Sequence, residues 1–348
     1  MYRFAPLTSR IRTRIRRHIG LPHGLGAAAA RSWAISPMVE KLMPSSIFDP
    51  DDLQKIVGVP VDDTIESQIS KAKGGWQQHR ATTAFELRGA VLTHGHLFTH
   101  KHTHKLDLTP LPFFARQAIQ HLDEAVLATS WYGTKYFGHW MTDDLPLMLA
   151  AHDVGRPIST LARPTPHQVK YMQTLSIEAE VCTSAYFRKI VILEDFGQND
   201  YKRQRYAELR ERARVEHAPR RQGGVMLLRG ASGALRVLHN ERAVAEMVTT
   251  RGFKVIDPST SSVSEIIESC LDASIVLGVE GSQLANGLMW MSTTGTLVVL
   301  QPPQRFNATH KDRCDCEGIR FAFVVGDRRG ESDFWIDIPA LERLLDRF

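Results

Sequence analysis

A histidine followed by two acids is the first feature of this sequence that could do chemistry. His139 and Asp143 are four residues apart, so on a helix they lie on one face, with Asp144 pointing to the side. A histidine with a carboxylate one turn away can act as a general base and take a proton from a substrate hydroxyl. The same spacing also suits a histidine that only caps a strand–helix turn. The pattern leaves both interpretations open.

A second set of polar residues could hold an anion. Its members follow predicted strands or begin predicted helices, and they are Arg229, Arg236, Asn240, Glu241, Glu280, Gly281 and Ser282. Arg229 ends a predicted strand, and ligands bind at the carboxyl ends of strands in open α/β folds. Residues 280–282 form a tight polar turn that ends in a good N-cap residue. Because arginines and helix N–H groups bind phosphate, the set predicts a diphosphate site, while each residue alone also fits a structural role.

Alternating strands and helices position the second set. The predicted strands are residues 225–230, 253–256, 274–279, 296–300 and 321–325. The predicted helices are residues 240–250, 264–272, 283–291 and a last one from 338. Ser262 or Ser264 is the expected cap of the second of these helices. This order predicts a doubly wound α/β unit.

A similar pattern surrounds the histidine and the two acids. Strands are predicted at residues 125–130, 159–163 and 190–194, and helices at 137–152, 167–175 and 200–217. The order predicts an open, mostly parallel sheet. Pro219 and residues 220–224 read as a linker to the second α/β unit. Two such units would enclose a cleft where two substrates can meet.

Residues 85–108 alternate as a β-hairpin does, with the turn near 93–96. Five histidines in this stretch are even-numbered: His94, His96, His100, His102 and His104. On one uninterrupted strand they would share a face and form a candidate metal cluster, but the glycine at 95 interrupts that register. A second metal-like group, His310 with Cys314 and Cys316, lacks a matching second half. We therefore expect no metal site.

The charge of the chain is concentrated at its N-terminus. The 348 residues carry a net charge of +5, yet six arginines lie in the first 17 residues and no acid precedes Glu40. Taking those six from the 43 basic residues leaves 37 against 38 acidic ones, so the body is neutral and nucleic-acid binding is disfavoured. Four cysteines in so long a chain indicate a reducing compartment. Without an apolar run of spanning length or a signal-peptide core, we expect a cytoplasmic protein.

Residues 1–45 have two interpretations. Ile11, Ile15 and Ile19 recur every four residues among the arginines, so a short basic amphipathic helix could lie on an anionic membrane surface. The alternative is a solvated or disordered tail.

Several enzyme classes find no support in the sequence. It has no GxSxG nucleophile elbow, no GxxxxGK[ST] phosphate loop, and no GxGxxG after a strand. These absences disfavour α/β-hydrolases, P-loop kinases and nicotinamide-dependent enzymes.

Taken together, four motifs resemble glycosyltransferase family 61, whose bacterial members are often labelled capsular polysaccharide biosynthesis proteins. In order, the motifs are YFGHWMTDDLP (136–146), LLRG with a later Asn-Glu pair (227–241), Gly-Phe (252–253) and SIVLGVEGSQLANGLMW (274–290). The match spans residues 85–302. The resemblance implies a GT-B-type fold, with two Rossmann-like domains facing a cleft. It also implies transfer of a sugar from a nucleotide-sugar donor to a glycan or other hydroxyl acceptor, with inversion and without an essential metal or other cofactor.

The resemblance also assigns residues. His139 and Trp140 match the family's His-Trp pair, and Asp144 with the following Leu-Pro matches its acid-Leu-Pro. Arg229, Asn240 and Glu241 match the arginine and Asn-Glu pair, while Gly281, Ser282, Leu284 and Asn286 match the glycine-turn motif. The sequence departs from the family at Glu280, where many members have a histidine, and at Gly138 directly before His139.

These expectations divide the chain into three parts. Residues 1–45 are a basic tail with a contact to an anionic membrane, 46–218 an acceptor-side domain with the hairpin, and 219–348 the nucleotide-sugar domain. His139 is the first candidate base, with Asp143, Asp144 and Glu280 behind it. Two alternatives are a non-catalytic sugar-nucleotide or polysaccharide-binding protein on the same fold, and a metal-dependent hydrolase built on the histidine cluster.

Overall fold

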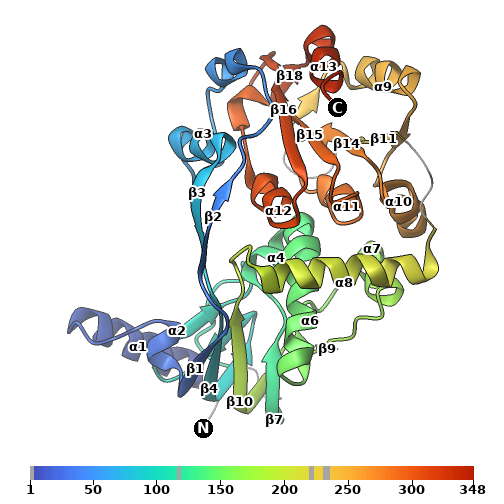
Figure 1. Ribbon diagram of the computed structural model, residues 1–348. Coiled ribbons are helices and arrows are strands. Elements are labelled where there is room, and N and C mark those ends of the chain that lie inside the picture. Colours follow the sequence, from blue (N-terminus) through green and yellow to red (C-terminus); the bar gives the residue numbers. More distant parts are fainter. Residues whose placement is uncertain (1–3, 116–118, 219–222, 230–235) are drawn as a thin grey trace. The chain divides into compact units, whose positions relative to one another are not determined.

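The structure, a computed structural model, describes residues 4–115, 119–218, 223–229 and 236–348 (Figure 1). It contains two compact units. The first consists of Met1–Val39 with Arg80–Arg205, and the second of Glu40–His79 with Tyr206–Phe348. Most of the predicted linker, residues 219–222, lies outside the described residues. The predicted division into an acceptor-side and a donor-side domain stays a prediction.

The first unit is built on a curled, mixed sheet. Its strands follow the order β6-β5-β4-β10-β7-β8-β9, with β1 also paired to β4. Their bounds are β1 (Arg31–Ser36), β4 (Thr82–Thr93), β5 (His96–Phe98), β6 (Thr103–Lys105), β7 (Gln120–Leu127), β8 (Pro157–Ser159), β9 (Glu180–Val181) and β10 (Ala185–Glu194). The prediction of a mostly parallel sheet is right only for β10-β7-β8-β9, because β4 runs antiparallel to β10.

The predicted hairpin is confirmed. β4 pairs antiparallel with β5, and the turn between them consists of His94 and Gly95. Both residues have positive φ, 50° and 67°, which is the backbone of a tight two-residue hairpin turn. The glycine therefore does interrupt the register of the histidines.

The first unit also contains helices. They are α1 (Ala5–His18), α2 (Leu25–Ala28), α4 (Trp131–Lys135), α5 (Phe137–His139), a π-helical segment (Trp140–Asp144), α6 (Leu145–Val154), α7 (Pro166–Thr174) and the start of α8 (Asp200–Glu216). Buried aliphatic and aromatic side chains of the strands, such as Leu87, Leu127, Phe187 and Ile190, form the core. β7 lies between β8 and β10, and all three are parallel. After β7 the chain adds β8 on one side of it and later adds β10 on the other side. The strand order therefore reverses at β7, which makes β7 a topological switch point.

The second unit contains a five-stranded parallel sheet, as predicted. Its order is β13-β11-β14-β15-β16. The bounds are β11 (Gly224–Leu227), β13 (Phe253–Ile256), β14 (Ile275–Val279), β15 (Thr296–Gln301) and β16 (Arg320–Val325). Its first strand, β11, lies between the second and third, so the switch point is between β11 and β14. These are the strands that carry the predicted anion-binding residues on their carboxyl ends.

Helices and a small sheet complete the second unit. The helices are α9 (Glu241–Thr250), α10 (Val263–Cys270), α11 (Leu284–Leu288), the 3-10 turn η4 (Pro303–Arg305), α12 (Thr309–Glu317) and α13 (Ile338–Leu345). β12 (Val237–Leu238), β17 (Asp327–Arg328) and β18 (Asp333–Trp335) form the small sheet. Ser262 caps α10 by accepting from the Glu265 N–H, as one of the two predicted caps. The α/β class is thus confirmed.

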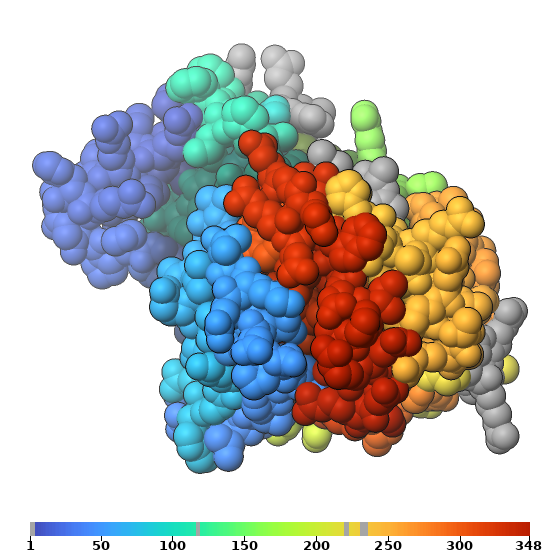
Figure 2. Space-filling view, turned by 90° about the horizontal axis from the view of Figure 1, so that it is seen from above, coloured from blue at the N-terminus to red at the C-terminus, as the bar shows by residue number. Residues whose placement is uncertain are grey.

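Residues 40–79 belong to the second unit. They form β2 (Val39–Met43), the 3-10 turn η2 (Pro50–Lys55), α3 (Ile65–Lys73) and β3 (Gly75–His79). Ile47 bridges to Ala322 of β16, and Lys71 forms an ion pair of 2.8 Å with Asp312 of α12. Figure 2 shows this light-blue segment packed beside the red C-terminal residues.

The range predicted as a tail contains regular structure. α1 is the predicted basic helix, and β1 adds a strand to the sheet of the first unit. In the part of the chain that the structure describes, no helix has the length and apolar character to cross a membrane.

Candidate active site

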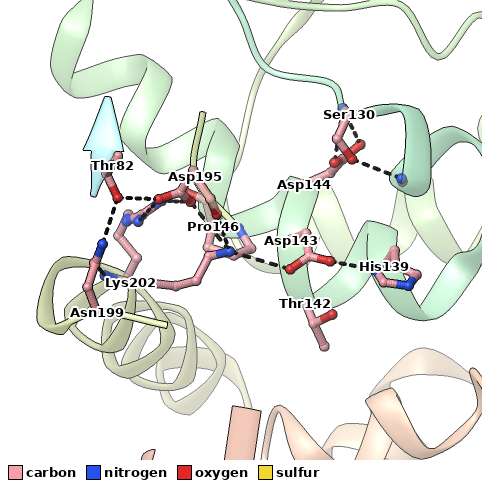
Figure 3. Close-up of polar contacts among 12 residues, drawn as sticks. Thr82, Ser130, His139, Thr142, Asp143, Asp144, Pro146, Asp195, Asn199 and Lys202 are labelled. Atoms are coloured by element: carbon pink, nitrogen blue, oxygen red, sulfur yellow. Dashed lines mark hydrogen bonds and ion pairs between the residues drawn. The ribbon is translucent and has the colours of Figure 1, made fainter. Parts of the chain in front are cut away.

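The predicted histidine and acid lie together in the first unit. The Nδ1 atom of His139 is 2.6 Å from Oδ2 of Asp143 (Figure 3). Both side chains are partly open to solvent, with exposed fractions of 28% and 21%. A carboxylate on Nδ1 fixes the tautomer and leaves Nε2 as the nitrogen that takes a proton. The pair therefore has the geometry of a general base.

A π-helical segment determines where these two residues point. The sequence predicts one regular helix over 137–152, but residues Trp140–Asp144 are π-helical, and the Leu145 N–H donates to the Trp140 carbonyl. The cause is Pro146, which has no N–H to donate to the Thr142 carbonyl and whose ring would collide with it. The wider turn accommodates the proline. Such segments are often found at functional sites.

A buried charge network supports Asp143 from behind. The ammonium of Lys202 is 3.4 Å from Oδ1 of Asp143 and donates to the Asp195 carbonyl at 2.6 Å. Arg205 forms two hydrogen bonds of 2.8 Å with the Asp195 carboxylate, which also accepts from Thr82 (Figure 3). Burial opposes ionisation of Asp195, but Lys202 and Arg205 outweigh it and lower its pKa.

Lys202, Asp195 and Arg205 were missed by the sequence analysis. They lie more than 50 residues from Asp143 along the chain. Asp195 follows a strand, and Lys202 and Arg205 look like ordinary charges at the start of a long helix. Asp195 follows β10, and the residues before His139 follow β7, its parallel neighbour. The carboxyl ends of parallel neighbours share one edge of the sheet, and this topology brings the network together.

Asp144 faces away from His139. It is 1% exposed and accepts from the Ser130 N–H at 3.1 Å (Figure 3). A Cβ atom on Gly133 would lie 2.0 Å from its Oδ2, so only glycine leaves room for the carboxyl. Burial raises the pKa of Asp144 to about 8. Asp144 thus stabilises the turn from β7 to α4. Its predicted catalytic role stays untested.

Two tyrosines flank the imidazole of His139. The ring centroids of Tyr132 and Tyr136 are 5.1 and 5.8 Å from it. Both tyrosines are exposed, at 43% and 39%. Exposed aromatic rings beside a base are suited to stacking on the apolar face of a sugar.

The predicted anion-binding residues meet at the switch point of the second unit. Nη1 of Arg229 and Nη1 of Arg236 both donate to the Glu280 carbonyl, each at 3.1 Å. The Glu280 carboxylate lies 2.9 Å from Arg236 and accepts from Asn307 at 2.9 Å. Glu280 is 3% exposed, so its charge is balanced inside the protein. Arg229, Arg236 and Glu280 thus lie together, and their role in anion binding stays a prediction.

Gly281 lets Arg229 reach this turn. It has a φ of 153°, and a Cβ there would lie 1.8 Å from Nη1 of Arg229. His310 contacts the Gly281 carbonyl through Nε2 at 3.1 Å. Any side chain at position 281 would therefore displace the guanidinium.

The helix after this turn is shorter than predicted. Residues 283–291 were expected to be helical with Ser282 as the cap, but α11 covers only Leu284–Leu288 and its N-cap residue is Gln283. The Ser282 prediction as a cap is wrong, because the chain forms turns through 281–283 before the helix begins. The Gln283 side chain, missed in the sequence, accepts from Arg229 at 3.0 Å.

Three further predicted residues form hydrogen bonds with backbone groups of the second unit: Asn240, Glu241 and Asn286. The Asn240 amide donates to the Ile336 carbonyl and accepts from the Ile336 N–H. Glu241 accepts from the Arg229 N–H, and burial raises the pKa of its carboxyl. Asn286 is 3% exposed and donates to the Gln283 carbonyl. These contacts brace the loops that carry Arg229 and Glu280.

A third arginine adds to the positive charge. Arg305 follows β15 and is close enough to Arg229 to lower its pKa, after burial, the larger cause, while Glu280 acts in the opposite direction. The Nε atom of Arg305 is buried and has no hydrogen-bond partner within the described residues. A buried donor of this kind next to two further guanidinium groups is typical of an anion site.

The proposed metal clusters receive no support from the geometry. In the part of the chain that the structure describes, no three or more His, Cys, Asp and Glu side chains are placed to hold a metal ion. His94 lies in the hairpin turn, and Cys314 and Cys316 are buried.

The fold and these two sites define an α/β protein with an acid–base pair and an arginine-rich loop. Residues 137–299, a little under half of the chain, match the model of the family described as Glycosyltransferase 61. This stretch includes both candidate sets from His139 to Asn286, and the match supports an assignment to glycosyltransferase family 61.

The other comparisons add little. No curated protein sequence matches this chain. Among solved structures, the metal-soaked Flv1 flavodiiron core from Synechocystis sp. PCC6803 matches with 12% identity and a TM-score of 0.23. That match covers 56% of this chain, which in turn spans 46% of that protein. So weak a similarity bears on neither fold nor function.

Proposed function

We propose that this protein is an inverting, GT-B-type glycosyltransferase that moves a hexosyl or pentosyl group from a nucleotide-sugar to a hydroxyl of a glycan acceptor. The two units act as Rossmann-like donor and acceptor domains, and no metal is required. The observation that carries the proposal is the convergence of Arg229 and Arg236 on the loop after β14. That loop lies at the switch point of a parallel sheet, where open α/β folds bind their ligands.

The second unit is proposed to hold the donor diphosphate. Arg229, Arg236 and Arg305 supply three guanidinium groups against the carboxylates of Glu280 and Glu241. Bidentate guanidinium groups stabilise the charge that develops on the leaving diphosphate. Glu280 keeps Arg229 and Arg236 in place before the donor binds, through its carbonyl and carboxylate.

The first unit is proposed to activate the acceptor. The acceptor oxygen forms a bond to the anomeric carbon from the face opposite the diphosphate, and its proton passes to Nε2 of His139. The bond from the anomeric carbon to the diphosphate oxygen breaks in the same step, and the nucleoside diphosphate leaves with both electrons. Asp143 stabilises the imidazolium that results.

Donor binding and turnover test the proposal together. The purified protein is screened against a panel of nucleotide-sugars by thermal shift, because a bound donor stabilises the folded state by mass action. Donors that bind are then incubated with a broad panel of glycan acceptors, and release of nucleoside diphosphate is measured. Donor-dependent release with glycan product is the expected result. Donor binding without turnover would favour a non-catalytic sugar-nucleotide-binding protein, and no binding would contradict the donor site.

We also propose a cellular setting. The resemblance to capsular polysaccharide biosynthesis proteins suggests that the product is a surface polysaccharide. The basic helix α1 is proposed to contact the anionic cytoplasmic face of a membrane, since its arginines attract acidic lipids.

A further inference from the structure

A large basic cavity lies in the first unit, outside the site described above. It has a volume of about 1050 Å³ and is bordered by α1, by β5 and β6, and by the segment 108–113. α1 is tied to the strand side of the cavity, because Ser9 is 3.0 Å from the Thr103 hydroxyl and donates to the His102 carbonyl at 3.2 Å. Thr13 donates to the Lys101 carbonyl one turn later. The helix is therefore part of the folded unit.

The lining of the cavity is positive. Arg10, Arg14 and Arg17 of α1 lie on one side and Lys105 of β6 on another, and the lining includes no carboxylate. Within the described residues, these three arginines form no ion pair. Unneutralised charges that converge on a cavity create a field that favours an anion.

The lining of the same cavity also includes apolar side chains. They are Leu7 and Ile11 of α1 and Leu108, Leu111 and Phe113 of the segment 108–113. Ile11, Leu108 and Phe113 are exposed by 50%, 55% and 62%. Further exposed apolar side chains lie close by in the sequence, namely Phe4, Ile15, Ile19, Leu21 and Phe114. A soluble anion needs no such surface, whereas exposed apolar residues among arginines are typical of a protein face that lies in a lipid headgroup layer.

A series of contacts connects the cavity to His139. The Lys105 ammonium lies 5.5 Å from the ring of Trp131, which packs edge-on against Tyr132 at 4.9 Å. Tyr132 in turn contacts the His139 ring at 5.1 Å. An anion held by Lys105 would lie next to the aromatic residues of the acceptor side.

We propose that this cavity binds the phosphate headgroup of a membrane lipid, with α1 and residues 108–114 lying in the headgroup layer. The inference deepens the membrane contact proposed above and depends on it. It does not depend on sugar transfer. Arg10, Arg14, Arg17 and Lys105 contact the phosphate, and the exposed apolar side chains contact the upper acyl chains.

A vesicle-binding experiment with charge-matched variants tests it. The full chain is mixed with vesicles of phosphatidylcholine alone or with phosphatidic acid added, and binding is measured by flotation. The variant Arg14→Ala/Arg17→Ala removes two charges that line the cavity. The control Arg12→Ala/Arg16→Ala removes two charges from the same helix outside the lining. Circular dichroism and a melting curve verify that both variants are folded.

The expected result is binding only to vesicles with phosphatidic acid. A surface arginine contributes roughly fivefold to such binding by charge alone, so the control should lose affinity too. The cavity variant should lose roughly tenfold more than the control. Equal losses would overturn the headgroup site while leaving the membrane contact in place, and no vesicle binding by the wild type would overturn both.

Two further measurements distinguish a site for a lipid headgroup from a site for a soluble anion. Inorganic phosphate alone should not stabilise the protein in a melting curve at the concentration of lipid phosphate that gives full binding. The variant Phe113→Ser should weaken vesicle binding without changing any charge. Stabilisation by inorganic phosphate that Arg14→Ala/Arg17→Ala abolishes, with Phe113→Ser binding as the wild type does, would indicate a site for a soluble anion and contradict the proposal.

Discussion

Asp143 is the residue whose contacts best explain how a half-exposed histidine could act as a base. It holds Nδ1 of His139 at 2.6 Å and is itself held by Lys202 at 3.4 Å. We expect Asp143→Ala to lower kcat about 100-fold, because the imidazole loses its tautomer and orientation, and to leave the KM for donor unchanged. The measurement is steady-state release of nucleoside diphosphate, with the exposed Asp62→Ala as control. A kcat within twofold of the wild type would remove Asp143 from the mechanism.

Gly281 is the residue on which the donor arginine depends. A methyl group there would occupy the position of Nη1 of Arg229, so Gly281→Ala must displace the guanidinium. We expect the KM for donor to rise about 10- to 100-fold, which corresponds to the loss of hydrogen bonds to a charged group. Gly223→Ala is the matched control, since a Cβ there meets nothing within 4 Å. Equal donor affinity for both variants would argue against Arg229 as a phosphate ligand.

Asp144 gives a stability prediction with a defined sign. Burial raises its pKa to about 8 in the folded protein from an ordinary value of 3.8, so between these values the folded state binds the extra proton. Its contribution to the free energy of unfolding is complete below the lower value and is lost as the pH rises toward 8. We expect Asp144→Asn to lose less thermal stability than the wild type between pH 5 and pH 8. Parallel melting temperatures across that range would show that Asp144 ionises normally.

At the scale of elements, the strand order of the second unit explains why its sites were predictable. Buried strands and the residues that follow them are local features, and Arg229 and Glu280 were placed at one sheet edge from the α/β pattern alone. The exact start of α11 was not predictable, because the turns through 281–283 and the contact between Arg229 and Gln283 depend on the folded loop rather than on the local sequence.

In the first unit, the sequence did not predict the contacts between residues that are far apart along the chain. Alternation in 85–108 predicted the hairpin, but nothing local indicated that β4 would pair antiparallel with β10, about a hundred residues later. Likewise, the ion pairs of Lys202 and Asp195 depend on sheet topology that the local pattern does not contain. The placement of residues 40–79 in the second unit has the same cause.

The π-helical segment is the element most open to experiment. With Pro146→Ala, the new N–H can donate to the Thr142 carbonyl and restore a regular helix, which would rotate Trp140–Asp144 relative to α6. We expect kcat to fall about tenfold through this misplacement, with the melting temperature unchanged or higher. Pro166→Ala is the control, because Pro166 is at the start of α7, where an N–H is not required. Unchanged turnover in Pro146→Ala would separate the π-helical segment from function.

At the scale of the whole molecule, the positive charge is concentrated at two proposed binding places. The body is close to neutral, yet arginines gather at two places, the loops after β11 and β15 and the face of α1. The loop after β11 lies within the family match, whereas the loop after β15 and α1 lie outside it. The sequence showed both concentrations of charge, but only the fold showed that α1 encloses a cavity.

The central claim is that His139 is the base of a glycosyl transfer. The measurement that tests it most directly is release of nucleoside diphosphate by the wild type and by His139→Ala at saturating donor, with donor affinity measured on both proteins. The predicted result is a kcat about 100- to 10,000-fold lower in the variant, with donor affinity unchanged. A variant that binds donor and keeps a kcat close to that of the wild type would contradict the claim.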